Sequence, residues 1–398
     1  MTDGPWLSLI GMAEDGLEGL TPASRQTLEA AEVIIGTQRL LNHVGSVSAE
    51  KVTWPVPFED GWPVLRSFAG RPTALLLSGD PFWFGAGAGV AERFEPGEWQ
   101  SFPAPSTFSL IASQLGWALE RCVCLGLHAA PLRRLRPHLA PRARLIVLLR
   151  DGDAVVGLAE YLTARGFGDS ALHVCEALGS EGARVTRVLA KDAGAGFTHP
   201  VAVGVEVHGD GTALPQTSGL PDDLFESDGQ MTKRVIRAAT LSALAPHPFE
   251  TLWDIGGGTG TIAIEWLLSH PTTHAVAVEP RHDRAERIAR NAKSFGVDRL
   301  TVVQGAAPEA LERLPTPDAV FIGGGLSEEM LRALTAALTP GTRLVANAVT
   351  LESEALVTQW QSARGGSLIR LTLEEASPLG SKRGWKASYP VTQWSVTL

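Results

Sequence analysis

The sequence is poor in cysteine, and it lacks both a long apolar run and an excess of positive charge. Its three cysteines, Cys122, Cys124 and Cys175, are too few for a disulfide framework and lack the partners of a zinc site, so a reducing cytoplasm and no bound metal are expected. The net charge of -9 disfavours a nucleic-acid partner, which needs a basic face. No apolar run of about 18 residues predicts a membrane span, and the first residues are unlike a signal peptide.

The length of 398 residues exceeds one ordinary hydrophobic core and predicts two domains. Apolar strand-like segments alternate with helical ones throughout, which is typical of α/β folds. The polar stretch 211–224 lacks periodicity and predicts a linker between a domain of residues 1–210 and one of residues 225–398. Strands are expected at Trp6–Ile10, Val33–Gly36, Ala74–Leu77, Arg144–Leu149, Leu172–Cys175 and Val201–Val207, and then near Leu252, Ala275, Leu300, Ala319, Thr342, Leu368 and at Val391–Leu398.

The most informative segment is residues 251–260, which read TLWDIGGGTG. They predict a buried strand, a glycine turn and the start of a helix over Thr261–Ser269. Glycines in such a turn let the backbone bend sharply and approach a ligand. A second strand, His274–Val278, ends at Glu279, whose carboxylate can accept hydrogen bonds from two ribose hydroxyls. Together these segments predict a site for an adenosine-containing cofactor.

The acid before the glycines narrows the choice of cofactor. Asp254 begins the order D-x-G-x-G-x-G, whereas dinucleotide enzymes use G-x-G-x-x-G, so a nicotinamide dehydrogenase is the weaker alternative. The pattern resembles the class I S-adenosylmethionine methyltransferases. This resemblance implies that Asp254 supports the loop and binds the amino-acid end of the cofactor. It also implies a seven-stranded sheet into which Val391–Leu398 is inserted as a late antiparallel strand.

Three turns in the first domain follow strands, at Leu9–Leu17, Ser78–Phe82 and Pro103–Ser109. Ligands bind at the carboxyl ends of strands in open α/β sheets, although ordinary turn chemistry would explain any one of the three. Ser106 or Thr107 is expected to cap a helix. The candidate cofactor-binding residues of these turns are Gly11, Gly79, Asp80, Pro81, Ser106 and Thr107.

In this order, the turns resemble those of the tetrapyrrole methyltransferases of corrin synthesis. Those are class III enzymes with two α/β lobes and S-adenosylmethionine folded between them. The resemblance covers about residues 6–207 and is greatest for the subunit that methylates carbon 5. Met12 and Ala13 stand where the wider group usually has a second glycine.

Two basic clusters lie in the second domain. The first, formed by Lys233, Arg234 and Arg237, follows Thr232, which is expected to cap a helix. The second, Lys382–Lys386, is expected in a glycine-rich loop. A solvated helix face would explain the first cluster, but cations at a helix start are unfavourable and indicate an anionic partner. Lysine and arginine suit a polycarboxylate substrate. The candidate substrate-binding residues are Lys233, Arg237, Lys382 and Lys386.

The second domain resembles the carbon-15 methyltransferases of cobalamin synthesis, which also remove the carboxyl group of the ring C acetate. The resemblance covers about residues 225–398 and includes Met231–Lys233, Gly305–Pro308, Phe321–Gly325 and Asn347–Glu352. It places no catalytic residue. It implies cofactor contacts from Thr232, Gly256, Gly257, Gly258, Thr259, Gly260, Glu279, Ala306 and Ala307.

The order of the domains implies one bifunctional, decarboxylating C-methyltransferase with S-adenosylmethionine in each domain and a polycarboxylate tetrapyrrole as substrate. Relatives of the two domains form dimers and tetramers, so a homo-oligomer is expected. A methyltransferase acting on nucleic acid or protein is one alternative, although Phe321–Gly325 replaces the motif of adenine-N6 enzymes. A fusion with one non-catalytic domain is the other.

Overall fold

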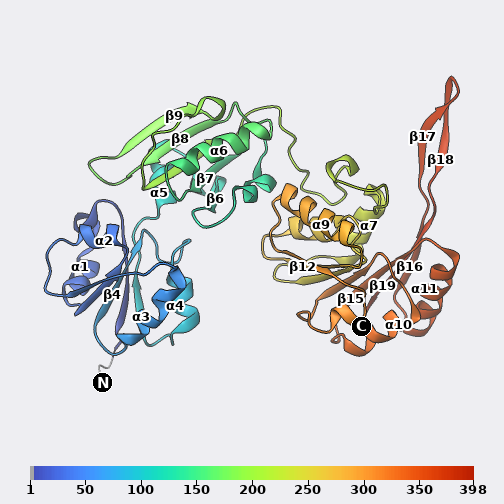
Figure 1. Ribbon diagram of the computed structural model, residues 1–398, viewed down its shortest axis with the longest axis horizontal. Coiled ribbons are helices and arrows are strands. Elements are labelled where there is room, and N and C mark those ends of the chain that lie inside the picture. The colour runs from blue at the N-terminus through green and yellow to red at the C-terminus, as the bar shows by residue number, and fades with distance from the viewer. Residues whose placement is uncertain (1–3) are drawn as a thin grey trace. The chain divides into compact units, whose positions relative to one another are not determined.

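The computed structural model describes residues 4–398, which fold into two compact α/β units (Figure 1). The first unit extends to Leu132 and resumes from His138 to Thr212, and the second comprises Arg133–Pro137 and Ala213–Leu398. No helix within residues 4–398 is long and apolar enough to cross a bilayer.

The first unit begins with a parallel sheet in the order β3-β2-β4-β1-β5. Helices α1 and α2 pack on one face of this sheet and α3 and α4 on the other, so its central strands are apolar on both faces. The strands are β1 (Leu7–Met12), β2 (Val33–Gly36), β3 (Glu50–Thr53), β4 (Thr73–Ser78) and β5 (Trp99–Phe102), and the helices are α1 (Pro22–Glu29), α2 (Gln38–His43), α3 (Gly61–Ser67) and α4 (Gly87–Arg93).

A second sheet completes this unit, in the order β6-β7-β10-β8-β9, and all its pairs except β6–β7 are antiparallel. Helix α5 begins after Ser106, whose hydroxyl accepts from the Ser109 amide at 3.1 Å, so Ser106 rather than Thr107 is the N-cap. The elements are β6 (Val123–Gly126), β7 (Arg144–Leu148), β8 (Ala171–Glu176), β9 (Arg184–Leu189), β10 (Val201–Glu206), α5 (Thr107–Leu115) and α6 (Asp153–Ala164).

The second unit contains the predicted seven-stranded sheet, in the order β13-β12-β11-β14-β15-β19-β16. Strand β19 is antiparallel to both neighbours, which confirms the predicted late insertion. Neighbouring residues of β11 point to opposite faces: Leu252 joins the core under α7, α8 and α9, and Trp253 joins the core under α10 and α11. The strands are β11 (Thr251–Ile255), β12 (His274–Glu279), β13 (Leu300–Gln304), β14 (Ala319–Ile322), β15 (Arg343–Ala348), β16 (Ser367–Leu371) and β19 (Val391–Thr397).

The helices of this unit are α7 (Arg234–Leu244), α8 (Thr261–Ser269), α9 (His282–Phe295), α10 (Glu328–Ala337) and α11 (Leu351–Arg364). The stretch expected as a linker contributes to their core, since Leu214 and Leu220 are buried there. The backbone amides of Gly219 and Leu220 donate to the buried Glu265 carboxylate at 2.6 and 3.0 Å. This stretch is therefore packed onto the second unit.

A two-stranded hairpin of β17 (Glu374–Leu379) and β18 (Lys382–Ala387) projects from the sheet (Figure 1). The prediction of a glycine-rich loop at Lys382–Lys386 is wrong, because these residues pair as a strand. The hairpin covers no core: Leu379 and Trp385 are 69% and 75% exposed. It therefore lacks the alternating apolar pattern by which a half-buried strand is predicted.

Candidate functional site

The loop between β11 and α8 is built on three glycines with left-handed backbone, Gly256, Gly258 and Gly260, at φ of 71°, 58° and 79°. Other residues adopt this conformation at a cost. A Cβ on Gly256 would also lie 2.7 Å from the Cα of Gly324, and one on Gly260 would lie 2.8 Å from Ile288. Only glycine fits at position 256. The loop therefore stays close to the sheet, and its backbone faces the cavity described below.

Asp254 lies beneath this loop at the end of β11 and is 2% exposed. Its Oδ2 accepts from the Ala263 amide in the first turn of α8 at 3.2 Å. Burial is the main cause that raises the pKa of Asp254 to about 7; the Ala263 hydrogen bond opposes this effect and the neighbouring Glu279 carboxylate adds to it. Asp254 therefore supports the loop by joining strand to helix.

Glu279 ends β12, and two backbone amides hold its carboxylate. Its Oε2 accepts from Gly258 at 2.9 Å, and its Oε1 accepts from Arg281 at 3.0 Å. Each carboxylate oxygen has two lone pairs, so both oxygens can accept one further hydrogen bond. A carboxylate fixed in this way next to a glycine loop suits the two hydroxyls of a ribose.

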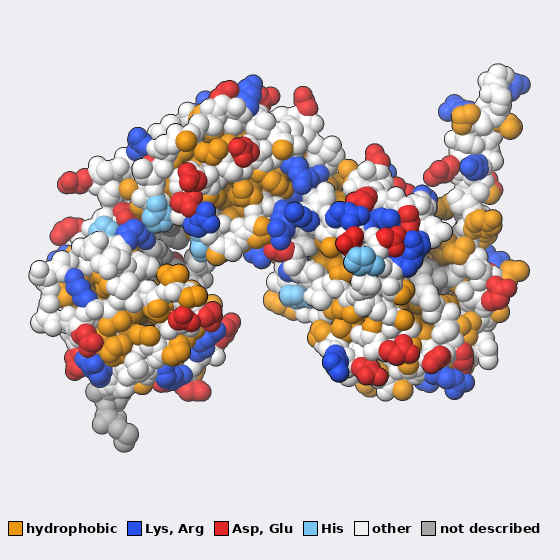
Figure 2. All heavy atoms as spheres, viewed as in Figure 1, with side chains coloured by type: hydrophobic (Ala, Val, Ile, Leu, Met, Phe, Trp, Pro, Cys, Tyr) orange, Lys and Arg blue, Asp and Glu red, His pale blue; other side chains and the backbone are white. Residues whose placement is uncertain are grey.

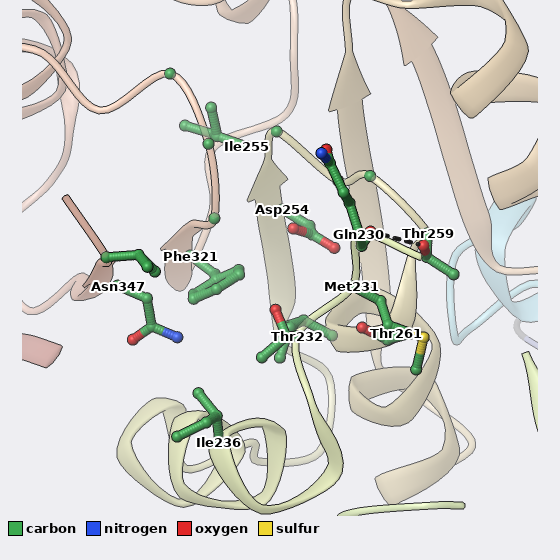
Figure 3. Close-up of a pocket in the computed structure, with 18 of the residues that line it drawn as sticks. Gln230, Met231, Thr232, Ile236, Asp254, Ile255, Thr259, Thr261, Phe321 and Asn347 are labelled. Carbon is green, nitrogen blue, oxygen red and sulfur yellow. Dashed lines mark hydrogen bonds between the residues drawn. The ribbon is translucent and has the colours of Figure 1, made fainter. Parts of the chain in front are cut away.

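Residues 226–232, here called the strap, cross the glycine loop. The Thr259 hydroxyl donates to the Gln230 carbonyl at 3.3 Å (Figure 3). Arg284 of α9 donates to Asp228 at 2.9 Å and also to the Gln230 side chain. Although burial alone would raise it, hydrogen bonds from the Gln230 amide and Arg284 lower the pKa of Asp228 to about 2. Figure 2 shows the interspersed basic and acidic side chains over α9 to which the strap is bound.

The loop, the strap and the carboxyl ends of the strands enclose a cavity of about 1480 Å³. It extends from Gly305–Ala307 after β13, past Glu279 and the glycine loop, to Phe321–Gly325 after β14 and Asn347 on β15. Residues Lys386–Val391, at the base of the hairpin, form its outer wall.

Most of the predicted residues of the second domain line this cavity: Thr232, Lys233, Asp254, Gly256, Gly257, Gly258, Thr259, Glu279, Ala306, Ala307 and Lys386. Gly260, the N-cap residue of α8, is not among the residues that line the cavity. Thr232 does not cap α7, because that helix begins at Arg234 with Lys233 in the capping position.

Arg237 is not available to a substrate, which corrects its prediction as a binding residue. Its side chain is 0% exposed. Its guanidinium donates to Glu265, to Asp222 at 3.0 Å and to the Thr232 carbonyl at 2.6 Å. A buried charge needs such compensation, and Arg237 therefore holds α7, α8 and the preceding segment together.

The other predicted cations differ in position. Lys233 and Lys386 are exposed side chains at the cavity wall, and Lys233 lies 3.9 Å from Asp222. Lys382 begins β18 and is not among the residues that line the cavity. The two basic clusters thus contribute one lysine each to the cavity.

Asn347 lines the cavity but was given no role from the sequence. Its Nδ2 donates to the Thr240 hydroxyl at 2.9 Å, and its Oδ1 accepts from the Gln393 amide at 2.9 Å. Gln393 also donates to Thr240, at 3.0 Å. A polar residue at the carboxyl end of a parallel strand was the available signal, but its buried partners are 107 and 46 residues away.

In the first unit, the three predicted turns meet. A Cβ on Gly11 would lie 2.0 Å from the Gly79 carbonyl oxygen and 2.6 Å from the Ala104 nitrogen. A Cβ on Gly79, whose φ is 64°, would lie 3.1 Å from both the Pro105 carbonyl oxygen and the Ser106 Cα. Backbones therefore approach one another here as closely as glycine allows.

Polar and aromatic groups surround this meeting point. Asp80 accepts from the Phe82 amide at 2.9 Å, which closes a turn that also contains Pro81. Thr107 is the first residue of α5. Trp83 and Phe84 are each 50% exposed and contact Phe108 with ring centroids 6.2 and 5.4 Å away.

Comparison with known families covers both units. The family described as tetrapyrrole (corrin/porphyrin) methylases matches residues 7–194, and the one described as precorrin methyltransferase domain matches residues 223–398. The precorrin-6Y C(5,15)-methyltransferase (decarboxylating) of a Sinorhizobium species is 48% identical over 99% of this chain and 96% of its own. The protein of the same name from Mycobacterium tuberculosis is 37% identical over 98% and 99%.

A crystal structure of the C-terminal domain of precorrin-6Y C5,15-methyltransferase from Rhodobacter capsulatus is 50% identical, covering 46% of this chain and 100% of its own, at a TM-score of 0.45. The two family matches and the full-length relatives agree on one assignment. The chain belongs to the family of decarboxylating precorrin-6Y C5,15-methyltransferases.

Proposed function

We propose that this protein methylates precorrin-6B at carbons 5 and 15 and removes the carboxyl group of the ring C acetate, giving precorrin-8, in cobalamin biosynthesis. The methyltransferases of this family use S-adenosylmethionine, which when bound supplies an activated methyl group. In this proposal the first unit methylates carbon 5, and the second methylates carbon 15 and decarboxylates. Each unit binds one cofactor, and the enzyme works in the cytoplasm.

The observation that carries the proposal is the extent of the cavity in the second unit. Sites for single small molecules have volumes of about 300–1,000 Å³, and this cavity of about 1480 Å³ exceeds them. It also continues past the adenosine-binding side to Phe321 and Asn347. Such a space accommodates a cofactor together with a large substrate.

The residues of the inner half fit the cofactor. Glu279 can accept from the ribose hydroxyls, while the Gly258 amide keeps its carboxylate in place. The strap covers the glycine loop and so restricts water at the cofactor. Ala306 and Ala307 offer small side chains to the adenine side. Orientation and exclusion of water are the main demands of a methyl transfer between bound groups.

The outer half suits an anionic substrate. Lys233 and Lys386 lie at the exposed wall of the cavity, where ammonium groups can pair with carboxylates. In the first unit, Gly11 and Gly79 bring together the turns that contain Asp80, Pro81, Ser106 and Thr107. We place the second cofactor at these turns.

We also propose that the protein forms a homo-oligomer. Leu379, Trp385 and Tyr389 of the hairpin and its base are 69%, 75% and 85% exposed, and clustered exposed apolar side chains are typical of interaction surfaces. Light scattering of the purified protein tests this. A mass of one chain at micromolar concentration would contradict it.

The test of the activity is mass spectrometry of precorrin-6B after incubation with the full-length protein and S-adenosylmethionine. We expect a product with two added methyl groups and one lost carbon dioxide. G256A places a Cβ against Gly324 and should abolish carbon dioxide release. G341A is the matched control, since Gly341 also has positive φ, at 95°, but open space around it.

Two results would contradict the proposal. One is an unchanged substrate mass although equilibrium dialysis shows that the cofactor binds. The other is carbon dioxide release by G256A at the wild-type rate. A stoichiometry of two cofactors per chain is expected, and one per chain would contradict the placement in both units.

A further inference from the structure

The inner wall of the cavity at β15 differs in charge from the rest of its lining. Around Asn347 the lining includes Thr232, Ile236 and Phe321 (Figure 3), and the Ile236 and Phe321 side chains are 5% and 2% exposed. None of these four residues is ionisable. The cationic residues of the lining are Lys233 and Lys386, which are exposed, and Arg281 and Arg284, of which Arg284 donates to Asp228 in the strap. The cavity thus has a neutral wall at β15 and cations elsewhere in its lining.

The Asn347 amide stands in this wall, and its orientation follows from its partners. The Thr240 hydroxyl has a single hydrogen, which it donates to the Ile236 carbonyl at 2.8 Å. Thr240 must therefore accept from both amides that contact it. This fixes the nitrogen of Asn347, rather than its oxygen, toward Thr240.

The same reasoning accounts for the rest of the network. Gln393 donates one hydrogen to Thr240 and the other to the Asn347 oxygen. Asn347 uses one of its two N–H bonds, and no hydrogen bond from the second to a residue of the described range 4–398 is found. Thr240 and Gln393 are 0% and 2% exposed and lie behind the wall. In Figure 3 the Asn347 amide is directed toward the space bordered by Phe321, Thr232 and Ile236.

We propose that this neutral wall is the subsite for the acetate that leaves as carbon dioxide, and that Asn347 positions that acetate through its free N–H. The proposal rests on the proposed function and adds where the decarboxylation occurs. The remaining carboxylates of the substrate bind at the exposed lysines.

The chemistry favours a neutral subsite for the leaving group. With the ring in its protonated imine form, the carbon–carbon bond to the carboxylate breaks and its electron pair enters the ring. Carbon dioxide leaves, and the exocyclic carbon takes the proton that the ring gives up, so a methyl group replaces the acetate. A cation beside the carboxylate would stabilise the reactant charge that disappears. A neutral wall with the Asn347 donor orients the carboxylate and leaves its charge poorly solvated.

The test measures carbon dioxide released per carbon-15 methyl transferred by the full-length enzyme, with precorrin-6B as substrate. Asn347→Leu keeps the approximate volume without the N–H, and Asn347→Asp replaces the donor with a like charge. We expect both to retain wild-type cofactor affinity and to lower the ratio at least tenfold, so that a methylated product retaining its carboxyl group accumulates. Asn347→Ser, with a shorter donor, should restore part of the ratio.

Thr240→Val tests the positioning without altering the cavity wall, and we expect a smaller fall in the same ratio. A wild-type ratio in N347L and N347D would overturn the proposal, as would an equal loss of methyl transfer and decarboxylation. If N347L and N347D fail to bind cofactor, an unchanged ratio in T240V overturns it instead. Failure of the wild-type enzyme to release carbon dioxide would contradict the proposed function itself.

Discussion

The Gly258 amide donates to the Glu279 carboxylate at 2.9 Å, so the tip of the glycine loop is bonded to the end of the neighbouring strand. The Arg281 amide donates to the other oxygen of the same carboxylate. Glu279 therefore shapes the loop, and in the proposed function it also offers acceptors to a ribose.

Glu279→Gln should weaken cofactor binding about 10- to 100-fold. A glutamine has one acceptor oxygen, so its amide group must face one of the two backbone donors, and a lost hydrogen bond to a charged group costs about 1.5–3 kcal/mol. Isothermal titration calorimetry with S-adenosylhomocysteine measures the effect. Glu286→Gln, on the exposed side of α9, is the control. Equal affinities of the two variants would show that Glu279 does not contact the cofactor.

Arg237→Met should destabilise the second unit without a specific effect on substrate binding. It leaves Glu265 buried and without its cation, at a cost of about 3–5 kcal/mol. Thermal unfolding should show a lower transition temperature, whereas Arg234→Met, at an exposed neighbour, should not. A stable R237M protein with a raised KM would restore the original prediction of a binding role.

Lys386→Ala should raise the KM for precorrin-6B about tenfold, because loss of about 1.4 kcal/mol of binding free energy is a factor of ten. Lys382→Ala is the matched control, since both lysines lie on β18 and only Lys386 lines the cavity. The cofactor affinity should be unchanged in both variants. Equal KM values would place the substrate elsewhere.

Asp254 should make stability depend on pH between about 4 and 7. Its folded pKa of about 7 lies above the value of 3.8 for a free carboxyl, so the folded state retains a proton that the unfolded state has lost. The contribution of this proton to the free energy of unfolding is fully present below pH 3.8, falls as pH rises and is lost above about pH 7. The free energy of unfolding of the wild type, measured with denaturant, should therefore fall relative to that of Asp254→Asn as pH rises from about 5 to 8. Parallel profiles would mean that Asp254 does not titrate in this range.

Gly11→Ala should abolish methylation at carbon 5 and leave decarboxylation intact. Its Cβ would lie 2.0 Å from the Gly79 carbonyl oxygen, so the turns of the first unit must separate. Gly97→Ala, which meets no atom within 4 Å, is the control. NMR of the product locates its methyl groups, and normal carbon-5 methylation by G11A would exclude these turns from the site.

Much of the fold could be predicted because the relevant signals are local. The helix expected over Thr261–Ser269 has those bounds, and the alternating segment from Val391 forms β19. The glycine loop and Glu279 follow the same logic, since each is read within a few residues of its strand.

The remainder depends on contacts between distant residues. Arg237 pairs with Glu265, 28 residues away, and nothing near Arg237 indicates that it is buried. Asn347 gains its orientation from Thr240 and Gln393 on other elements. The hairpin strands face solvent, so no hydrophobic periodicity marks them.

The position of β19 constrains how the second unit forms during translation. The ribosome makes β16 before β19, yet β16 reaches the sheet only through β19, which lies between it and β15. Until β19 emerges, β15 remains an unpaired edge, which is prone to pairing with other chains. Gln393 arrives on that strand opposite Asn347, so a nascent chain closes its sheet and completes its polar network in a single late event.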